Sequence, residues 1–252
     1  DSAFLFAGAL TVATYFDRDT ADEAEIRNLA DALYRRADWN WASDGEATLT
    51  HGWRPESGFI PHRWQGYDEG LLLYILGLGS PTYPLPPESY RAYCATYQWK
   101  TIYNRELLYS GPLFTHQLSH MWVDFRGIRD EFMQARGSDY FENSRQATLV
   151  QQEYAVRNPM DFAGYGEHCW GFTACDGPGW TKRVVNGVER EFFDYVGRGA
   201  PFGPDDGTVA PWVVVASLPF AAEIVVPTVR HFAEMDLGMT NKYGFKPSFN
   251  QS

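Results

Sequence analysis

Two neighbouring segments constrain the fold most, because their apolar residues repeat in two different helical patterns. Residues 2–16, SAFLFAGALTVATYF, are apolar on nearly every face, which is typical of an inner helix that is buried on all sides. Residues 19–38 place Ile26, Leu29 and Leu33 at helical spacing with charges opposite, which predicts an amphipathic helix. An inner apolar helix followed by an outer amphipathic helix predicts a layered, all-α architecture.

The rest of the chain continues this pattern, with long loops between its helices. Residues 39–65 lose the helical period and are rich in Trp, Gly and Pro, which predicts a loop with a short β-hairpin. Residues 158–208 are expected to be mostly loop. No linker or low-complexity tract divides the sequence, so residues 1–252 are predicted to form one domain. Further helices are expected at about 71–79, 87–97, 113–123, 138–157, 209–218 and 221–236.

Charge and composition narrow the class of ligand. The 252 residues carry a formal net charge of -11 without a basic run, which argues against nucleic acid or an anionic membrane as a partner. Aromatic residues make up 16% of the chain, and many lie in Gly- and Pro-rich loops. Sugar rings stack on exposed aromatic faces, so an uncharged carbohydrate fits this composition better than a polyanion.

Targeting, membrane and redox signals are weak. The amino-terminal residues lack a basic n-region, so they are not expected to be a signal peptide. The apolar run at residues 209–229 approaches membrane-span length, but Glu223 and three prolines favour a buried, broken helix pair, and no membrane span is predicted. Three cysteines without CxxC spacing indicate neither a zinc site nor a disulfide framework, while one bridge between Cys169 and Cys175 stays open.

Residues 63–87 are the stretch around which the other candidates are arranged. The polar loop RWQGYDEG delivers Asp68 and Glu69 at the first turn of the apolar helix LLLYILGLG. An acid there is favoured by the helix dipole, so Asp68 is interpreted most simply as a cap. Glu69 would lie at the lip of a buried helix, beside aromatic residues that can stack on a ligand.

Other acids stand among glycines and aromatic residues in the later loops. These are Glu167, Asp176, Asp205 and Asp206. Cleavage of a glycosidic bond needs two carboxyl groups, one protonated as general acid and one ionised as base or nucleophile. The loops supply candidates for both roles, although aspartate in a Gly-Pro loop commonly serves the turn itself.

Metal and nucleotide sites find little support. His116 and His120 are four residues apart on an expected helix, but Gln117 occupies the position where a metalloprotease motif has its Glu. Both are therefore interpreted as histidines of the core or of the layer of residues that supports a site. The sequence contains neither GxxxxGK nor a GxGxxG that follows a strand. No metal and no cofactor are predicted.

Five ordered motifs carry a family resemblance over nearly the whole chain. They are GYDEGLLLYILGLGSPTYPLP, GPLFTHQLSHMWVDFRGIRD, RNP followed by GYGEHCWGFTACDG, PDDGTVAPWVVVASLPFAAEI and NKYGF. In these the chain resembles the glucoamylase-like (Glycoamylase) domain family, which is related to bacterial endo-β-1,2-glucanases and to the carboxy-terminal region of cyclic β-1,2-glucan synthases.

The resemblance implies an (α/α)6 toroid and a glycoside hydrolase or transglycosylase that acts on a β-linked glucan, β-1,2-glucan above all. It places Glu69 where the family has its leading acid. Family members also carry a D-x-x-E-T-A-F stretch, of which Asp1-Ser2-Ala3-Phe4 matches the tail, with Asp1 in the Glu position. The chain is therefore expected to be part of a longer toroid whose first helices precede residue 1.

The expected roles follow from this match. Glu69 and Asp1 are the catalytic candidates, while Trp64, Tyr67, Trp170 and Trp180 would form sugar-stacking walls. The remaining substrate-binding candidates are His62, Arg63, Gln65, Glu167, Asp176, Asp205 and Asp206. The partner would be an oligosaccharide or polysaccharide, the resemblance favours a periplasmic or secreted location, and the oligomeric state is open.

Two other functions are compatible with the sequence. A non-catalytic glycan-binding or assembly module would keep the toroid and the aromatic residues without a complete acid pair. Isoprenoid cyclisation in an α-toroid would need acid clusters that bind Mg²⁺ and a diphosphate, and Asp205-Asp206 is the only adjacent aspartate pair.

Overall fold

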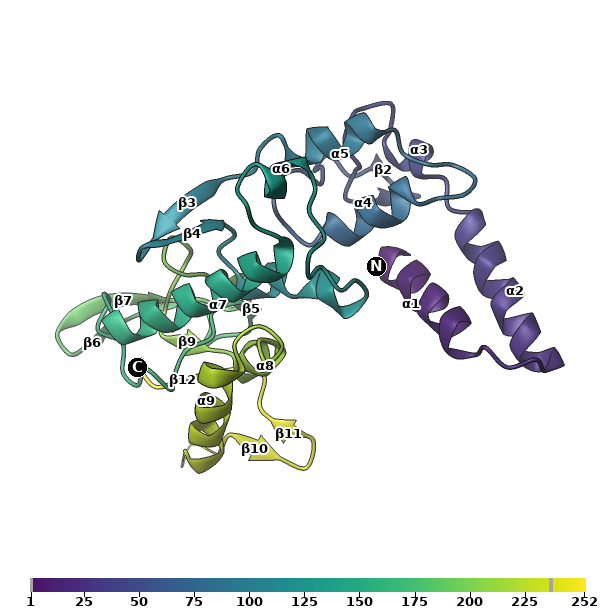
Figure 1. The fold of residues 1–252 in the computed structure, drawn as a ribbon. Coiled ribbons are helices and arrows are strands. Elements are labelled where there is room, and N and C mark those ends of the chain that lie inside the picture. The colour runs from purple at the N-terminus through teal and green to yellow at the C-terminus, as the bar shows by residue number, and fades with distance from the viewer. Residues whose placement is uncertain (1, 236–237) are drawn as a thin grey trace. The chain divides into compact units, whose positions relative to one another are not determined.

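The computed structural model describes residues 2–235 and 238–252, and its elements are drawn in Figure 1. Contacts between Cα atoms divide the chain into two compact units, Asp1–Gln98 and Trp99–Ser252. The secondary structure is rich in helices, joined by loops and by short two-stranded sheets. In the described ranges, no helix combines the length and apolar character that crossing a membrane would require.

The first unit contains the predicted pair of helices, which lie side by side in Figure 1. The second helix of the pair begins after Thr20, whose side chain accepts a hydrogen bond from the Glu23 amide, as expected for an N-cap. Its remaining elements include the predicted hairpin and apolar helix. The unit comprises α1 (Ser2–Tyr15), α2 (Ala21–Arg35), α3 (Trp39–Ala42), β1 (Trp53–Arg54), β2 (Gly58–Phe59), α4 (Leu71–Leu78) and α5 (Pro87–Cys94).

The prediction that residues 2–16 form a helix buried on all sides is wrong in one respect. The helix is present, but only Ala3 and Ala7 are buried, whereas Leu5 and Tyr15 are exposed. A helix that is apolar all round needs neighbours all round, and within its unit α1 packs mainly on α2 and α4.

The second unit is built on α7, the longest of its helices. Asp139 caps the start of α7 by accepting from the Glu142 amide, and Asn158 ends it in the left-handed conformation at φ 42°. The sequence pattern predicts a buried stripe of Phe141, Ala147, Val150 and Tyr154; the last three are buried in the core of the unit, whereas Phe141 is only half-buried. The other helical elements are η1 (Leu113–His116), η2 (Leu118–Met121), α6 (Glu131–Gln134), α8 (Pro211–Ala216) and α9 (Ala222–Glu234).

Two hairpins occupy stretches for which the sequence predicts no helix or strand. β3 (Trp99–Ile102) pairs with β4 (Arg105–Leu108), and β6 (Thr181–Val185) pairs with β7 (Val188–Phe192), both antiparallel. The loops of these hairpins contain Asn104 and Asn186 at positive φ, a conformation that asparagine tolerates and that tight hairpin turns require. The shorter strands are β5 (Ala174–Cys175), β8 (Val196–Gly197), β9 (Thr208–Val209), β10 (Thr240–Asn241), β11 (Gly244–Phe245) and β12 (Phe249–Asn250).

The helix expected at residues 113–123 is instead the pair of 3₁₀ turns η1 and η2. They meet at Gln117, whose side-chain amide donates to Val213 O (2.9 Å) and to Ser217 Oγ (2.8 Å). Tertiary hydrogen bonds of this kind can override a weak local helix preference.

Candidate active site

Two buried tyrosines of the first unit hold the loop that carries Asp68 and Glu69. Tyr74 of α4 donates to Trp64 O (2.8 Å) and accepts from the Leu49 amide (3.0 Å). Tyr93 of α5 stacks on Tyr74 with ring centroids 4.4 Å apart, and its carbonyl accepts from the Gly66 amide (2.8 Å). Both tyrosines are 0% exposed, so they form a well-packed support for the loop.

Asp68 lies half-buried against Tyr93. Its Oδ1 accepts from the Gly70 amide (2.8 Å) and from the Tyr93 hydroxyl (3.1 Å). The pKa of Asp68 is raised from 3.8 to about 7, because burial and, to a smaller extent, the charge of Glu69 raise it more than the two hydrogen bonds lower it. Gly70 is the N-cap residue of α4, so Asp68 fixes the preceding turn rather than capping the helix itself.

Glu69 is half-buried next to this carboxyl, and it also faces an imidazole. Burial and the neighbouring His62 lower the pKa of His51, while the negative charge of Glu69 opposes this. His51 stacks on Trp64 with ring centroids 4.1 Å apart and an interplanar angle of 25°. One place in the fold therefore brings together two carboxyl groups, two imidazoles and an indole, as the sequence predicts for His62, Trp64 and Glu69.

Arg63 and Tyr67, in the same loop, make structural contacts. Arg63 turns away from the rings, and its guanidinium donates to Thr48 Oγ1 (3.0 Å) and to the carbonyls of Ser43 and Thr48. Tyr67 is buried and packs edge-on against Tyr97, so it offers no open face to a sugar. The structure thus contradicts the binding roles of Arg63 and Tyr67: Arg63 clamps the loop and Tyr67 belongs to the core. Gln65 is exposed and stays a prediction, and Asp1 lies outside the described residues.

The predicted site residues of the second unit separate into exposed and buried side chains. Glu167 and Asp176 are exposed, and Trp180 is 67% exposed with its ring edge-on to Phe193. Their roles stay predictions. Trp170 is 0% exposed, and its Nε1 donates to Thr228 Oγ1 (2.9 Å) in the core. The prediction that Trp170 forms a stacking wall is therefore wrong, because its rings have no accessible face.

The two aspartates of the PDDG loop both serve the structure. Asp206 is 0% exposed and forms a fork with the guanidinium of Arg198, through Nε to Oδ1 and Nη2 to Oδ2, each 2.7 Å. Burial raises the pKa of Asp206, but the hydrogen bonds from Arg198 outweigh it and the net pKa is lowered. The predicted contact between Asp206 and substrate is thus contradicted by its burial.

Asp205 accepts from the hydroxyls of Tyr154 (2.8 Å) and Tyr165 (2.6 Å). Burial raises the pKa of Asp205 against these hydrogen bonds. The aspartate pair is therefore engaged inside the protein, which removes the feature that isoprenoid cyclisation required.

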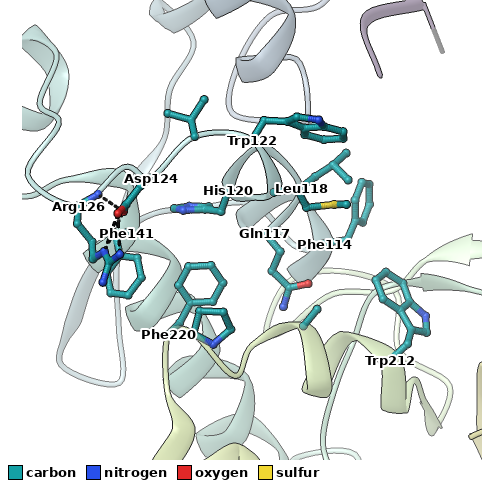
Figure 2. A pocket seen from close by; sticks show the side chains of 14 residues that line it. Phe114, Gln117, Leu118, His120, Trp122, Asp124, Arg126, Phe141, Trp212 and Phe220 are labelled. Carbon is teal, nitrogen blue, oxygen red and sulfur yellow. Dashed lines mark hydrogen bonds and ion pairs between the residues drawn. The ribbon is translucent and has the colours of Figure 1, made fainter. Parts of the chain in front are cut away.

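A cavity of about 710 Å³ in the second unit was not predicted. It lies between η1, η2, the start of α7 and the junction of α8 with α9. Figure 2 shows the rings of Phe114, Trp122, Trp212 and Phe220 around it, with the Asp124–Arg126 ion pair (2.6 Å) at one side. The signal available in the sequence was the run of large apolar and aromatic residues that includes Phe114, Leu118, Met121 and Trp122, whereas the prediction for this segment considered only its two histidines.

Of the two histidines of that segment, His116 belongs to the core, whereas His120 is half-buried and lines the cavity. His116 is 1% exposed and contacts Ser110 O (3.2 Å), and His120 contacts Ser144 Oγ (3.0 Å). Burial lowers the pKa of each to about 4. Within residues 2–235 and 238–252, no group of three or more His, Cys, Asp or Glu side chains could hold a metal ion. Cys169 and Cys175 are separate thiols in this structure.

The sequence profile of the Glycoamylase family, described as "Putative glucoamylase", matches residues 61–252. This chain belongs to the Glycoamylase family. It is 26% identical over 279 aligned residues to the exo β-1,2-glucooligosaccharide sophorohydrolase (non-reducing end) of Parabacteroides distasonis. That alignment covers 99% of this chain and 36% of the relative, so the chain spans about a third of the length of that protein.

Solved structures of Glycoamylase-like proteins share the fold. A "putative glucoamylase" from Bacteroides uniformis superposes with a TM-score of 0.86 at 33% identity, covering 99% of this chain and 58% of that one. The endo-β-1,2-glucanase of Chitinophaga pinensis, solved with sophorotriose and glucose, gives a TM-score of 0.84 at 26% identity, covering 99% and 58%. The resemblance drawn from the five motifs is thereby confirmed.

Proposed function

We propose that the protein is a glycoside hydrolase that cleaves a β-linked glucan, with β-1,2-glucan as its substrate class. Two similar proteins are named for action on β-1,2-linked glucans, which supports the linkage. The observation that carries the chemistry is the Asp68–Glu69 pair, in which burial raises the pKa of one carboxyl to about 7. The rings of Trp64 and His51 beside the pair supply a surface on which a sugar can stack.

Asp68 would hold a proton near neutral pH, because burial, with a smaller contribution from the neighbouring charge of Glu69, raises its pKa to about 7. Asp68 is fixed by Gly70 and Tyr93, whereas Glu69 is the member that can meet the substrate. Glu69 would therefore protonate the leaving oxygen as general acid, and Asp68 would keep the proton available.

A second carboxylate must activate water or attack the sugar. Asp1 is the candidate from the sequence, or an acid upstream of it, and this stays a prediction. The separation of the reacting carboxyl groups decides the stereochemistry, roughly 6.5–9.5 Å for inversion and about 5–5.5 Å for retention. The proposed setting is an (α/α)6 toroid, supported by the TM-scores to glucoamylase-like structures.

Hydrolysis by the Glu69→Gln variant tests the assignment. Loss of the general acid should lower kcat on β-1,2-glucan by about 10²–10⁴-fold. Glu25→Gln, on the exposed side of α2, is the matched control and should leave kcat unchanged. Full activity of Glu69→Gln would refute the role of Glu69.

The same assay separates the enzyme from a non-catalytic glycan-binding module. Native protein that binds β-1,2-glucan in calorimetry without releasing product would support the binding module and overturn the proposed hydrolase.

A further inference from the structure

The hairpin of the first unit is longer than β1 and β2. The Trp64 amide donates to Leu49 O (2.8 Å), the His51 amide donates to His62 O (2.9 Å), and Thr50 forms a bridge with Arg63. One antiparallel ribbon, made of residues 49–54 and 58–64, therefore runs from the loop before Asp68 to the turn at residues 55–57.

The register of this ribbon changes by one residue along its length. Thr50 pairs with Arg63, whereas Trp53 pairs with Phe59, so three steps on one strand match four on the other. The extra residue is a β-bulge at residues 60–61, and a bulge of this kind re-aims the side chains that follow it.

The bulge decides which side chains share a face. Side chains alternate along a strand, so His51 and Trp53 point to one side of the ribbon. Their partners on the second strand are His62, which lies opposite His51, and Phe59, which lies opposite Trp53. Without the bulge, Phe59 would point to the other side.

The rings on this face form two contacting groups, and four of them, His51, His62, Trp41 and Trp53, are exposed. The ring centroids of His51 and His62 are 5.9 Å apart. Trp41 of α3 lies against the far end of the ribbon, with centroids 4.8 Å from Phe59 and 6.1 Å from Trp53. Trp41 is 53% exposed and Trp53 is 47% exposed, which is unusual for two large rings packed together.

We propose that this face of the ribbon, here called the ring track, binds the sugars of the glucan that lie beyond the one at Glu69. The ring track consists of Trp64, His51, His62, Trp53, Phe59 and Trp41. This inference rests on the proposed function and extends it, since none of Trp53, Phe59 and Trp41 is among the residues that the sequence assigns to substrate.

Three observations favour a glucan as the occupant. The track is continuous with the acid pair, because the charge of Glu69 acts on His51 and His51 stacks on Trp64. Indole and imidazole rings combine an apolar face with a polar edge, which suits a sugar with its C–H face and hydroxyl rim. Trp64 lies opposite Leu49 and Phe59 lies opposite Trp53, four steps along the first strand, so the track extends for roughly 13 Å, which exceeds one sugar ring.

The test compares kcat/KM on β-1,2-glucooligosaccharides of increasing length, using the full-length protein. We expect Trp53→Ala to lower kcat/KM for long oligosaccharides by about tenfold, equivalent to about 1.4 kcal/mol, and to leave the shortest cleaved substrate nearly unchanged. Trp53→Phe keeps a ring and should retain most of the length dependence. Tyr243→Ala removes an 84% exposed ring of the β10–β11 hairpin and serves as the matched control, with no effect at any length.

Equal losses by Trp53→Ala at every length, or no loss at any length, would overturn the ring track. Circular dichroism and thermal melting of each variant identify a loss that comes from misfolding, and Trp41→Ala then repeats the test from a different element. If the native protein cleaves no β-1,2-glucan, the proposed function is refuted, but the ring track can still be tested by binding. The Kd of the same oligosaccharides, measured by calorimetry, would then support the track if Trp53→Ala weakens only the longer ones, and would overturn it otherwise.

Discussion

Asp68 gives the sharpest test of the electrostatics at the acid pair, through the pH dependence of folding. Burial raises its pKa from 3.8 to about 7, so the folded protein holds a proton that the unfolded chain releases near pH 4. Between these two values the folded state binds more protons, and stability therefore falls as pH rises. At 1.36 kcal/mol per pKa unit the full effect is about 4 kcal/mol, of which about 2.5 kcal/mol develops between pH 5 and pH 8.

The Asp68→Asn substitution removes this proton but keeps an oxygen that can accept from Gly70 and Tyr93. Urea unfolding of both proteins at pH 5 and pH 8 measures the free energy of unfolding directly. We expect the native protein to lose about 2.5 kcal/mol more than Asp68→Asn over this interval. Asp194→Asn, at an exposed carboxyl, is the control and should follow the native protein.

Parallel pH profiles of the native protein and Asp68→Asn would refute this reasoning, because they would show that Asp68 ionises equally in both states. A direct measurement is the carboxyl ¹³C titration of Asp68 by NMR. A midpoint near 4 would contradict a buried, proton-holding carboxyl and remove the chemical basis for the acid pair.

Two further predictions concern residues for which sequence and structure disagree. Asp206→Asn leaves the buried Arg198 guanidinium without its counter-charge and should lower the free energy of unfolding by about 3–5 kcal/mol in urea titrations; a loss below about 1 kcal/mol would contradict the buried pair. Trp170→Ala should cost about 3–5 kcal/mol because its rings are fully buried, while Trp180→Ala, at a 67% exposed ring, should stay within about 0.5 kcal/mol; equal losses would show that the assigned burial is wrong.

Local patterns were sufficient for much of the helical framework. The Asp19-Thr20 start and the spacing of Ile26, Leu29 and Leu33 predicted α2, because capping and amphipathic periodicity act within a few residues. The same holds for α4, α7 and the paired α8 and α9, and for the hairpin before the acid loop. The five motifs also predicted the family, which the comparisons confirm.

The candidate site was only partly accessible from the sequence. The sequence was sufficient to group Glu69, His62 and Trp64, because a polar aromatic loop that enters an apolar helix is visible in it, and the structure places the three near one another. Their roles stay predictions. Asp68 was interpreted as a cap, since the tyrosines that bury its carboxyl lie on other elements, with Tyr93 25 residues away. A pKa depends on that environment rather than on the neighbouring sequence.

The sequence by itself determined the family, most helices and the position of the acid loop, because these follow from short-range patterns. Only the tertiary structure decided which aromatic and acidic side chains are open to a ligand. Trp170 and Trp180 stand in similar Gly-rich loops, yet one lies in the core and the other at the surface. The ring track likewise depends on a single extra residue in one strand, and that residue changes which side chains share a face. Burial and register are set by contacts between segments distant in sequence, and the spacing of residues within one segment cannot specify them.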